Sequence, residues 1–178
     1  GKESPALIFA RGVANIAITG SGTINGQGAH QNFQHGNDSK GGPRRPKIIY
    51  FIGCNNVRVQ DVTLRNSAYW TQDYEKCNGV IVRGVKVYSH ANWNNDGLDI
   101  DSRNVVVSDC YIDCDDDALC LKSDTDTPCE NVTVTNCVLK SNCNAIKFGT
   151  SSYSGFKNVT ISNCTIDRAS EDHIRQWY

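Results

Sequence analysis

The chain has 178 residues, a net charge of −1, nine cysteines and no methionine. Its near-neutral charge excludes the basic surface of a nucleic-acid-binding protein, and no apolar run reaches the ~18 residues that span a bilayer, so neither partner is predicted. Because the N-terminus lacks the regions of a signal peptide and no initiator methionine is present, we expect a piece of a longer protein.

One short unit recurs along the chain and predicts its secondary structure. It is clearest in NVVVSDCYID, NVTVTNCVLK and NVTISNCTID, which begin 27 residues apart. Residues 29–46 form an inserted loop after the first, weaker copy. In chain order the copies begin at Asn15, Asn56, Gly79, Asn104, Asn131 and Asn158. Apolar and polar residues alternate in each copy, which predicts a β-strand opened by a turn residue.

The length of the unit predicts the fold. Units of 23–27 residues built from strands without helices are typical of an all-β parallel β-helix, a solenoid whose coils stack on one another. Stacking in register places equivalent residues of neighbouring coils ~4.8 Å apart. We therefore expect a single β-helix domain over residues 1–178, incomplete at both ends, in which residues distant in sequence form columns.

Cysteine recurs at fixed places in the unit. One column holds Val62, Val85, Cys110, Cys137 and Cys164, and another holds Cys54, Cys77, Ser102, Cys129 and Phe156. This recurrence indicates small apolar side chains stacked inside the coil, although disulfides between neighbouring coils stay possible on distance alone. No CxxC pair occurs, so neither a metal site nor a cofactor is predicted.

A second set of segments aligns as seven-residue words at residues 96–102, 117–123 and 144–150, with a poorer match at 172–178. The third and fifth residues of each word are apolar in most copies and should point inward. They are Leu98, Leu119, Ile146 and Ile174, then Ile100, Leu121, Phe148 and Gln176. The fourth and sixth should point outward. They are Asp99, Cys120, Lys147 and Arg175, then Asp101, Lys122, Gly149 and Trp177.

These outward positions form one face with acidic groups at one end and basic groups at the other. One interpretation is a salt-bridged solvent face in which Asp101 pairs with Lys122, an exposed interaction that contributes only ~0–1 kcal/mol. The other is that basic side chains a coil or two from the acids bind an anionic sugar.

Three acids meet where two of the words begin. Asp96 and Asp117 open words on neighbouring coils, and Asp116 directly precedes Asp117. Like charges this close should raise at least one pKa, so that one acid stays protonated while the others are ionised. Such a set suits hydrolysis of a glycosidic bond, in which an acid protonates the leaving oxygen and a carboxylate activates water. An Asp-rich turn and a calcium site are the alternatives.

Several motifs, in order, resemble a known family. They are GSGTINGQG (20–28), RPKIIYFIGCNNVRVQDVTLRNSAYWT (45–71), NNDGLDID (94–101) and DDDALCLKS (115–123). Together they resemble motifs of the polygalacturonase-like glycoside hydrolases, the pectin-degrading family 28, over most of the chain. The last two resemble that family's Asn-Thr-Asp-Gly and Gly-Asp-Asp-Cys motifs.

The resemblance implies a right-handed parallel β-helix that hydrolyses a galacturonate-containing pectic polysaccharide with inversion. Carried over by position, Asp96 and Asp117 would hold and activate the water, and Asp116 would be the general acid. Asp115 occupies the family's Gly position and is interpreted as a bystander. The resemblance also implies a secreted or periplasmic enzyme, and we expect a monomer.

The chain departs from the family pattern in its basic residues. Cys143 and Asn144 stand where the family has Gly-His-Gly, and the family's Arg-Ile-Lys motif is matched only by Arg175. Lys147, on the same outward column, could substitute for the missing lysine. The predicted substrate-binding residues are Lys122, Asn144, Lys147, His173 and Arg175. These departures make a pectic linkage other than plain polygalacturonate an open alternative.

Two rival functions stay open. The first is a polysaccharide lyase of the same architecture, with calcium on the aspartates and Lys147 or Arg175 taking the proton. The second is a β-helix that binds glycan without cleaving it, which the missing histidine favours.

Other polar and aromatic residues also have two readings. His90, six residues before Asp96, is interpreted as a solvated loop residue. Trp70 and Trp93 could stack on a sugar ring or be buried. The sequons at Asn37, Asn131, Asn158 and Asn163 are interpreted as turn residues rather than glycan acceptors.

Overall fold

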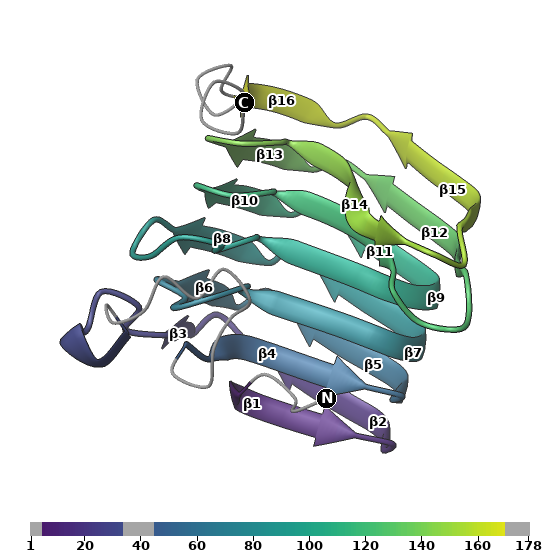
Figure 1. Ribbon diagram of the computed structural model, residues 1–178, viewed down its shortest axis with the longest axis horizontal. Helices are drawn as coiled ribbons and strands as arrows, with labels where there is room; N and C mark the ends of the chain where they lie inside the picture. Colours follow the sequence, from purple (N-terminus) through teal and green to yellow (C-terminus); the bar gives the residue numbers. More distant parts are fainter. Residues whose placement is uncertain (1–4, 34–44, 170–178) are drawn as a thin grey trace.

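Every paired strand in the computed structural model runs parallel to its neighbours, which lie one coil before or after it in the chain. The structure describes residues 5–33 and 45–169. The coils stack into a solenoid (Figure 1), so the predicted parallel β-helix is confirmed. Within the described ranges, no helix is both long and apolar enough to cross a membrane.

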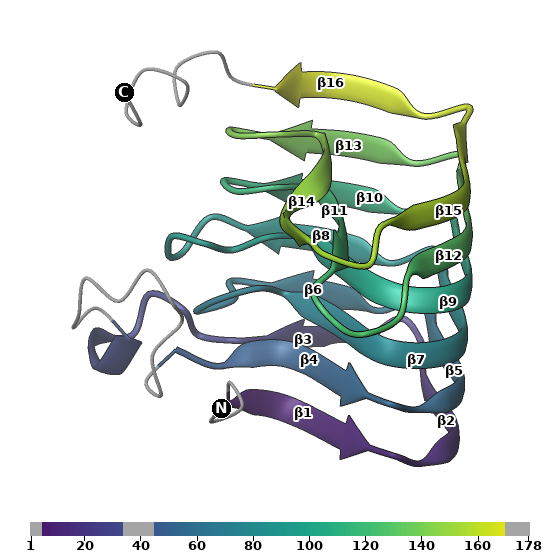
Figure 2. The ribbon, with the colours of Figure 1, turned by 45° about the vertical axis from the view of Figure 1, so that its right-hand side comes forward.

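Two sheets form the walls of the solenoid (Figure 2). One path through the ten-stranded sheet is β1 (Ala6–Arg11), β4 (Lys47–Ile52), β7 (Gln72–Arg83), β9 (Leu98–Ser108), β11 (Leu119–Ser123) and β14 (Ile146–Ser152). A second path joins it through β7 and β9 and adds β2 (Ala14–Thr19), β5 (Asn55–Gln60), β12 (Cys129–Thr135) and β15 (Phe156–Ser162).

The six-stranded sheet contributes one strand to each coil. It comprises β3 (Thr23–Asn25), β6 (Thr63–Arg65), β8 (Lys86–Ser89), β10 (Tyr111–Cys114), β13 (Val138–Ser141) and β16 (Thr165–Ala169). The segments that follow β6, β8, β10 and β13 leave the solenoid along the same edge, on the left in Figures 1 and 2. This edge therefore collects side chains from several coils.

The repeat sets the register of the strands. Val132 of β12 pairs with Val105 of β9 and with Val159 of β15, each 27 residues away. The asparagines that open the units have positive φ, for example 55° at Asn131, which Asn tolerates better than most residues. Their side chains form a ladder, in which Asn131 Nδ2 donates to Asn104 Oδ1 at 3.0 Å.

The predicted core lies inside the coils. Leu98, Ile100, Leu119 and Leu121 are fully buried, as the alternation of the words requires. Most of the cysteines of both columns are buried too, whereas Cys164 at the C-terminal end is only half-buried. All nine cysteines are free thiols, so stacking inside the coil, rather than disulfide formation, explains their recurrence.

Phe148 departs from the expected pattern. Its side chain is 50% exposed rather than inward, and Ile146 is only half-buried. The register between β11 and β14 shifts after Leu121, and within the described residues β14 has no strand beyond it. The Phe148 ring instead packs edge-on against Phe156, with centroids 4.9 Å apart.

Part of the predicted elements lies outside the described residues. Of the inserted loop, the structure describes a single 3-10 turn, η1 (Gln31–Phe33), and the residues next to it. The word at 172–178, with His173 and Arg175, and the sequon at Asn37 fall outside the described ranges. The other three sequon asparagines have φ between 52° and 55°, as expected of turn residues.

Candidate active site

The predicted acids lie at one corner of the solenoid, where the six-stranded sheet passes to the ten-stranded sheet. Backbone hydrogen bonds stack the starts of successive words in this corner. The Gly97 N–H donates to the Asp117 carbonyl at 2.8 Å, and the Ala118 N–H donates to the Asn144 carbonyl at 2.9 Å. Asp96, Asp117 and Asn144 therefore occupy equivalent places on three successive coils.

Gly97 lets these coils approach closely. A Cβ at this position would lie 2.3 Å from the Ile112 side chain and 2.7 Å from the Ala118 carbonyl oxygen. Only glycine fits such a contact without a shift of the backbone. Gly97 therefore allows Asp96 to lie directly against the coil that carries Asp117.

The three acids share one electrostatic environment. An oxygen of Asp96 and one of Asp117 lie within 4.8 Å of each other and of the Cys120 thiol. Oxygens of Asp116 and Asp117 lie equally close to each other and to the Cys143 thiol. The structure therefore brings together all three acids that the sequence nominated.

Asp96 is buried, and its pKa is raised. It is 4% exposed, and burial raises its pKa well above the usual range, with further increases from the charges of Asp99 and Asp116. Its Oδ1 atom has no hydrogen-bond partner among the described residues. A buried carboxyl oxygen without a partner is unfavourable unless a water or a ligand group binds it.

Asp116 is half-buried, and both of its carboxyl oxygens accept a hydrogen bond. Burial raises its pKa, as does the neighbouring charge of Asp117. The Asp117 N–H donates to its Oδ1 at 3.0 Å and Asn94 Nδ2 donates to its Oδ2 at 3.4 Å. These hydrogen bonds oppose the increase, because they favour the ionised form.

Asp117 is held by the next coil. Lys147 Nζ lies 2.7 Å from its Oδ2, and Asn144 Nδ2 donates to its Oδ1 at 2.7 Å. Both residues were predicted to bind substrate, and the structure puts both at the acid cluster. The Lys147 side chain remains 31% exposed, so it is accessible from the corner.

Cys143 lies in the segment where the family has Gly-His-Gly, directly before Asn144. Its thiol lies beside Asp116 and Asp117 and accepts a hydrogen bond from Asn144 Nδ2 at 3.2 Å. Burial raises the pKa of Cys143 to about 12, and the two aspartates add to the effect. The group is therefore a neutral thiol at ordinary pH, and neither it nor the Asn144 amide can supply the positive charge of a histidinium.

Lys122 pairs with a different acid from the one expected. Its Nζ lies 3.3 Å from Asp99 Oδ1, whereas Asp101 accepts the Asp124 N–H at 2.9 Å. The expected pair of Asp101 and Lys122 is therefore wrong. Asp99 is fully buried, and burial raises its pKa to about 7. The charge of the nearby Lys122 ammonium opposes this increase.

Trp70 covers the buried ion pairs beside the acids. Lys122 Nζ lies 4.3 Å from the centre of the Trp70 ring, and Lys47 Nζ lies 4.4 Å from it. Lys47 in turn pairs with Asp73. Because Trp70 also stacks on Tyr69 at 5.1 Å, its ring is engaged by protein groups on more than one side.

Trp93 presents more of its ring to solvent. Its side chain is 40% exposed in the segment just before Asp96. The buried guanidinium of Arg45 lies 3.6 Å from the ring centre and donates to the Trp93 carbonyl at 2.6 Å. Of the two tryptophans, Trp93 is thus the more exposed, since Trp70 is half-buried.

Two residues set aside at the sequence level belong to the site's surroundings. Asp115, which was interpreted as a bystander, has polar partners of its own: His90 Nδ1 lies 2.7 Å from its Oδ1, and Asn142 Nδ2 donates to that oxygen at 2.5 Å. His90 is exposed in a loop, as expected, and it also lies between two carboxylates. The signal in the sequence was the Asp at a family Gly position, which leaves an extra carboxylate to be accommodated.

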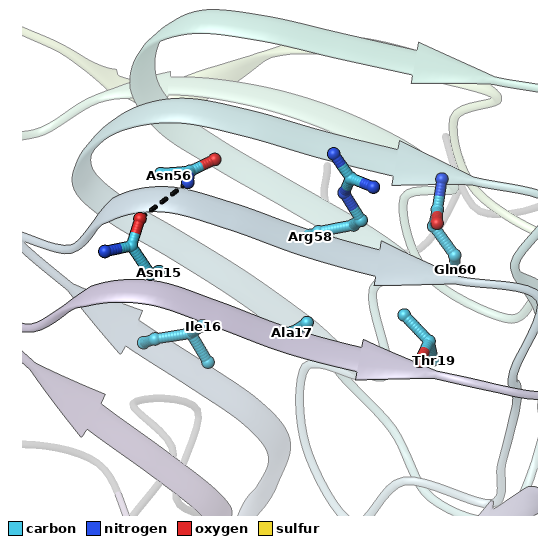
Figure 3. A pocket seen from close by; sticks show the side chains of 7 residues that line it. All are labelled: Asn15, Ile16, Ala17, Thr19, Asn56, Arg58 and Gln60. Carbon is cyan, nitrogen blue, oxygen red and sulfur yellow. Dashed lines mark hydrogen bonds between the residues drawn. The ribbon is translucent and has the colours of Figure 1, made fainter.

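A separate hollow lies on the outer surface of β2 and β5 (Figure 3). It has a volume of about 270 Å³ and is lined by Asn15, Ile16, Ala17, Thr19, Asn56, Arg58 and Gln60. It contains none of the predicted site residues.

Comparison with known proteins shows what the chain is similar to. The model of glycosyl hydrolases family 28 matches residues 1–175. A probable polygalacturonase of Arabidopsis thaliana is 33% identical over 115 residues, which cover 64% of this chain and 24% of that protein. A probable polygalacturonase of Vitis vinifera is 32% identical over 126 residues, which cover 68% of this chain and 25% of that protein.

Among solved structures, the hyperthermoactive exopolygalacturonase of Thermotoga maritima superposes with a TM-score of 0.78 at 26% identity. The superposition covers 90% of this chain and 46% of that one. The chain thus spans about a quarter of the length of the curated relatives it matches. From the family match over nearly its whole length, the chain belongs to glycosyl hydrolases family 28.

Proposed function

We propose that the whole protein hydrolyses glycosidic bonds in a galacturonate-containing pectic polysaccharide. The observation that carries this proposal is the cluster of Asp96, Asp116 and Asp117, in which one buried oxygen, Asp96 Oδ1, has no partner among the described residues. Membership of a hydrolase family and the similarity to polygalacturonases support the reaction and the substrate class. A secreted or periplasmic location would suit such a substrate.

In the proposed mechanism, Asp96 and Asp117 bind and orient the attacking water, and Asp116 protonates the leaving oxygen. The unpartnered Asp96 Oδ1 supports a water at this place, because that water would satisfy it. A water that donates to Asp96 would also lower its raised pKa, since the hydrogen bond favours the ionised form. The raised pKa of the more accessible Asp116 supports its role as the acid.

Inversion of the anomeric configuration is part of the proposal. The water bound by Asp96 and Asp117 would attack from one face of the sugar ring, while Asp116 protonates the oxygen on the other. A single displacement of this kind inverts the configuration. Lys147, with its accessible ammonium, is the described residue best placed to bind a substrate carboxylate.

The side chains that contact Asp117 argue against a calcium-dependent lyase. Lys147 and Asn144 already contact Asp117, so a divalent cation there would meet a positive charge. The hydrolase is tested with the full-length protein on a panel of pectic polysaccharides. Saturated reducing ends are expected, with inverted anomers in the first NMR spectra of the products. Unsaturated, ultraviolet-absorbing ends would instead identify a lyase.

The role of Asp116 is tested by Asp116→Asn. This substitution keeps the size of the side chain but removes the transferable proton, so kcat should fall by about 10²- to 10⁴-fold. Binding of oligogalacturonides, measured by calorimetry, should persist. If Asp116→Asn keeps the wild-type kcat, Asp116 is not the acid, and if wild-type protein binds these glycans without cleaving them, the protein is a binding module.

A further inference from the structure

Asp115, the first aspartate of the DDD motif, has contacts that the proposed mechanism does not use. Asp115 directly precedes the candidate acid Asp116, and its side chain is 32% exposed. A carboxylate next to two others adds repulsion unless it has partners of its own. The hydrogen bonds of Asp115 supply such partners, from the coil before it and the coil after it.

The preceding coil contributes His90 and Asn95. His90 lies between two carboxylates, with Nδ1 2.7 Å from Asp115 Oδ1 and Nε2 3.0 Å from Asp113 Oδ1. Asn95 is fully buried and donates from Nδ2 to Asp115 Oδ2 at 3.3 Å. Both residues belong to the segment between β8 and β9, which also carries Asp96.

Asn95 also binds the main chain of the motif. Its Oδ1 accepts the Asp115 N–H at 3.1 Å and the Asp116 N–H at 2.9 Å. Its Nδ2 donates to the Ser89 carbonyl at 2.6 Å, which ties it to the end of β8. The backbone of the candidate acid is therefore attached to the coil that carries Asp96.

The following coil contributes Asn142, whose Nδ2 donates to Asp115 Oδ1 at 2.5 Å. Asn142 lies two residues before Asn144, which contacts Asp117. Next to it, Ser141 Oγ donates to the Asp116 carbonyl at 2.6 Å. Asp115 thus connects the three turn segments from which the whole acid cluster is built.

We propose that Asp115, held by His90 and Asn142, is a positioning residue that fixes the main chain of Asp116 relative to Asp96. It acts in place of the glycine expected at this position. The inference rests on the proposed hydrolytic function, because its consequence is the placement of the acid. A misplacement of a catalytic group by about 1 Å is enough to reduce the rate by about 10²-fold.

The test is Asp115→Gly in the full-length protein, with kcat and KM measured on the pectic polysaccharide that the wild type cleaves. The contacts of Asp115 with His90 and Asn142 form a clamp. Loss of the clamp should lower kcat by about 10- to 100-fold with little change in KM, because the acid is displaced while the sugar-binding groups remain. Asp115→Asn keeps the shape and should restore part of kcat. The matched control is Asp109→Gly, at an exposed turn of the same coil with a φ of 58°, and should leave kcat unchanged.

A double-substitution cycle separates positioning from general stability. His90→Ala should lower kcat by itself, and Asp115→Gly should lower it much less when His90 is already absent, because both remove one interaction. Fully additive effects, or a lowered melting temperature with unchanged kcat, would overturn the proposal.

A second readout does not require activity. The carboxyl carbon of Asp116, followed by NMR with labelled aspartate, should titrate at a different pH in Asp115→Gly than in Asp115→Asn, because both variants lack the Asp115 charge but only Asp115→Asn keeps the shape of the side chain. The same titration in both variants would contradict the clamp even in a protein that cleaves no pectic substrate. An inactive wild type with different Asp116 titrations in the two variants would instead contradict the hydrolase proposal and leave the clamp supported.

Discussion

At the scale of single residues, three consecutive aspartates make three different sets of contacts. Asp115 is bound by His90 and Asn142, Asp116 accepts the backbone N–H of Asp117, and Asp117 pairs with Lys147. Repulsion among the three is therefore reduced by partners on the coils before and after them. Identical side chains acquire different environments because they point to different neighbours.

The sequence predicted which acids meet, but it could not predict what holds them. Asp96 and Asp117 open aligned words, so stacking in register was enough to bring them together. By contrast, the partners of Asp115, which are His90, Asn95 and Asn142, lie in irregular segments between strands. Such segments have no periodicity, and the direction of their side chains depends on contacts between coils.

Trp93 provides a prediction at this scale. Its ring is 40% exposed beside the acid cluster, and a sugar ring stacked on it would gain about 0.5–1.5 kcal/mol. Trp93→Ala should therefore raise KM by about 2- to 12-fold, while kcat changes little. Trp93→Phe should recover most of the affinity, because it keeps an aromatic surface.

The control for this variant is Tyr153→Ala. Tyr153 is 84% exposed and follows the end of β14, whereas the acid cluster lies at the start of that strand. Its removal should leave KM unchanged. An equal rise of KM in both variants, or no rise in Trp93→Ala, would show that Trp93 does not stack on the substrate.

At the scale of the strands, the repeat predicted both the elements and their register. The copies at Asn104, Asn131 and Asn158 are in fact stacked, with Asn131 Nδ2 donating to Asn104 and Asn158 Nδ2 donating to Asn131. The alternation predicted the wrong orientation at Phe148 in β14, which has no further strand stacked on it among the described residues. Phe148 has the alternation of an inward residue, yet it is exposed, because burial depends on a further strand and not on the pattern alone.

The ladder makes Asn131 a sensitive position. Its φ is 55°, a conformation that costs alanine about 1–2 kcal/mol, and each lost hydrogen bond adds about 0.5–1.5 kcal/mol. Asn131→Ala removes two such bonds and should lower the free energy of unfolding by about 2–5 kcal/mol, as measured by urea denaturation. Asn131→Gly tolerates the same φ and should lose less. Equal losses in the two variants would show that the backbone conformation contributes nothing.

At the scale of the whole molecule, the outer face of the ten-stranded sheet buries more carboxyl groups than its lysines neutralise. Burial raises the pKa of Asp99 to about 7 and that of Asp101 to about 6, and it also raises the pKa of Asp96 well above its usual range. The sequence suggested a solvated face here, because alternation distinguishes inside from outside but not covered from open. Trp70 and the paired lysines cover this face.

These raised pKa values determine how stability should depend on pH. A carboxyl group whose pKa is higher in the folded state than its ordinary value of 3.8 binds its proton more tightly when folded. Its contribution to stability is therefore complete below about pH 4 and is lost as the pH rises through about 6 to 7. Asp126 acts in the opposite direction, because its hydrogen bond with Lys76 lowers its pKa. Since Asp126 is exposed, its contribution to stability is small.

The melting temperature should accordingly be higher near pH 5 than near pH 7.5, as measured by calorimetry at constant ionic strength. Asp99→Asn removes one of the responsible groups without changing its size, so the difference between the two pH values should shrink in this variant. Asp167→Asn, on the exposed surface, should keep the wild-type difference. A melting temperature that rises steadily from pH 5 to 7.5 would mean that these buried carboxyls are ionised without penalty, and the raised pKa values of Asp99 and Asp101 would then be wrong.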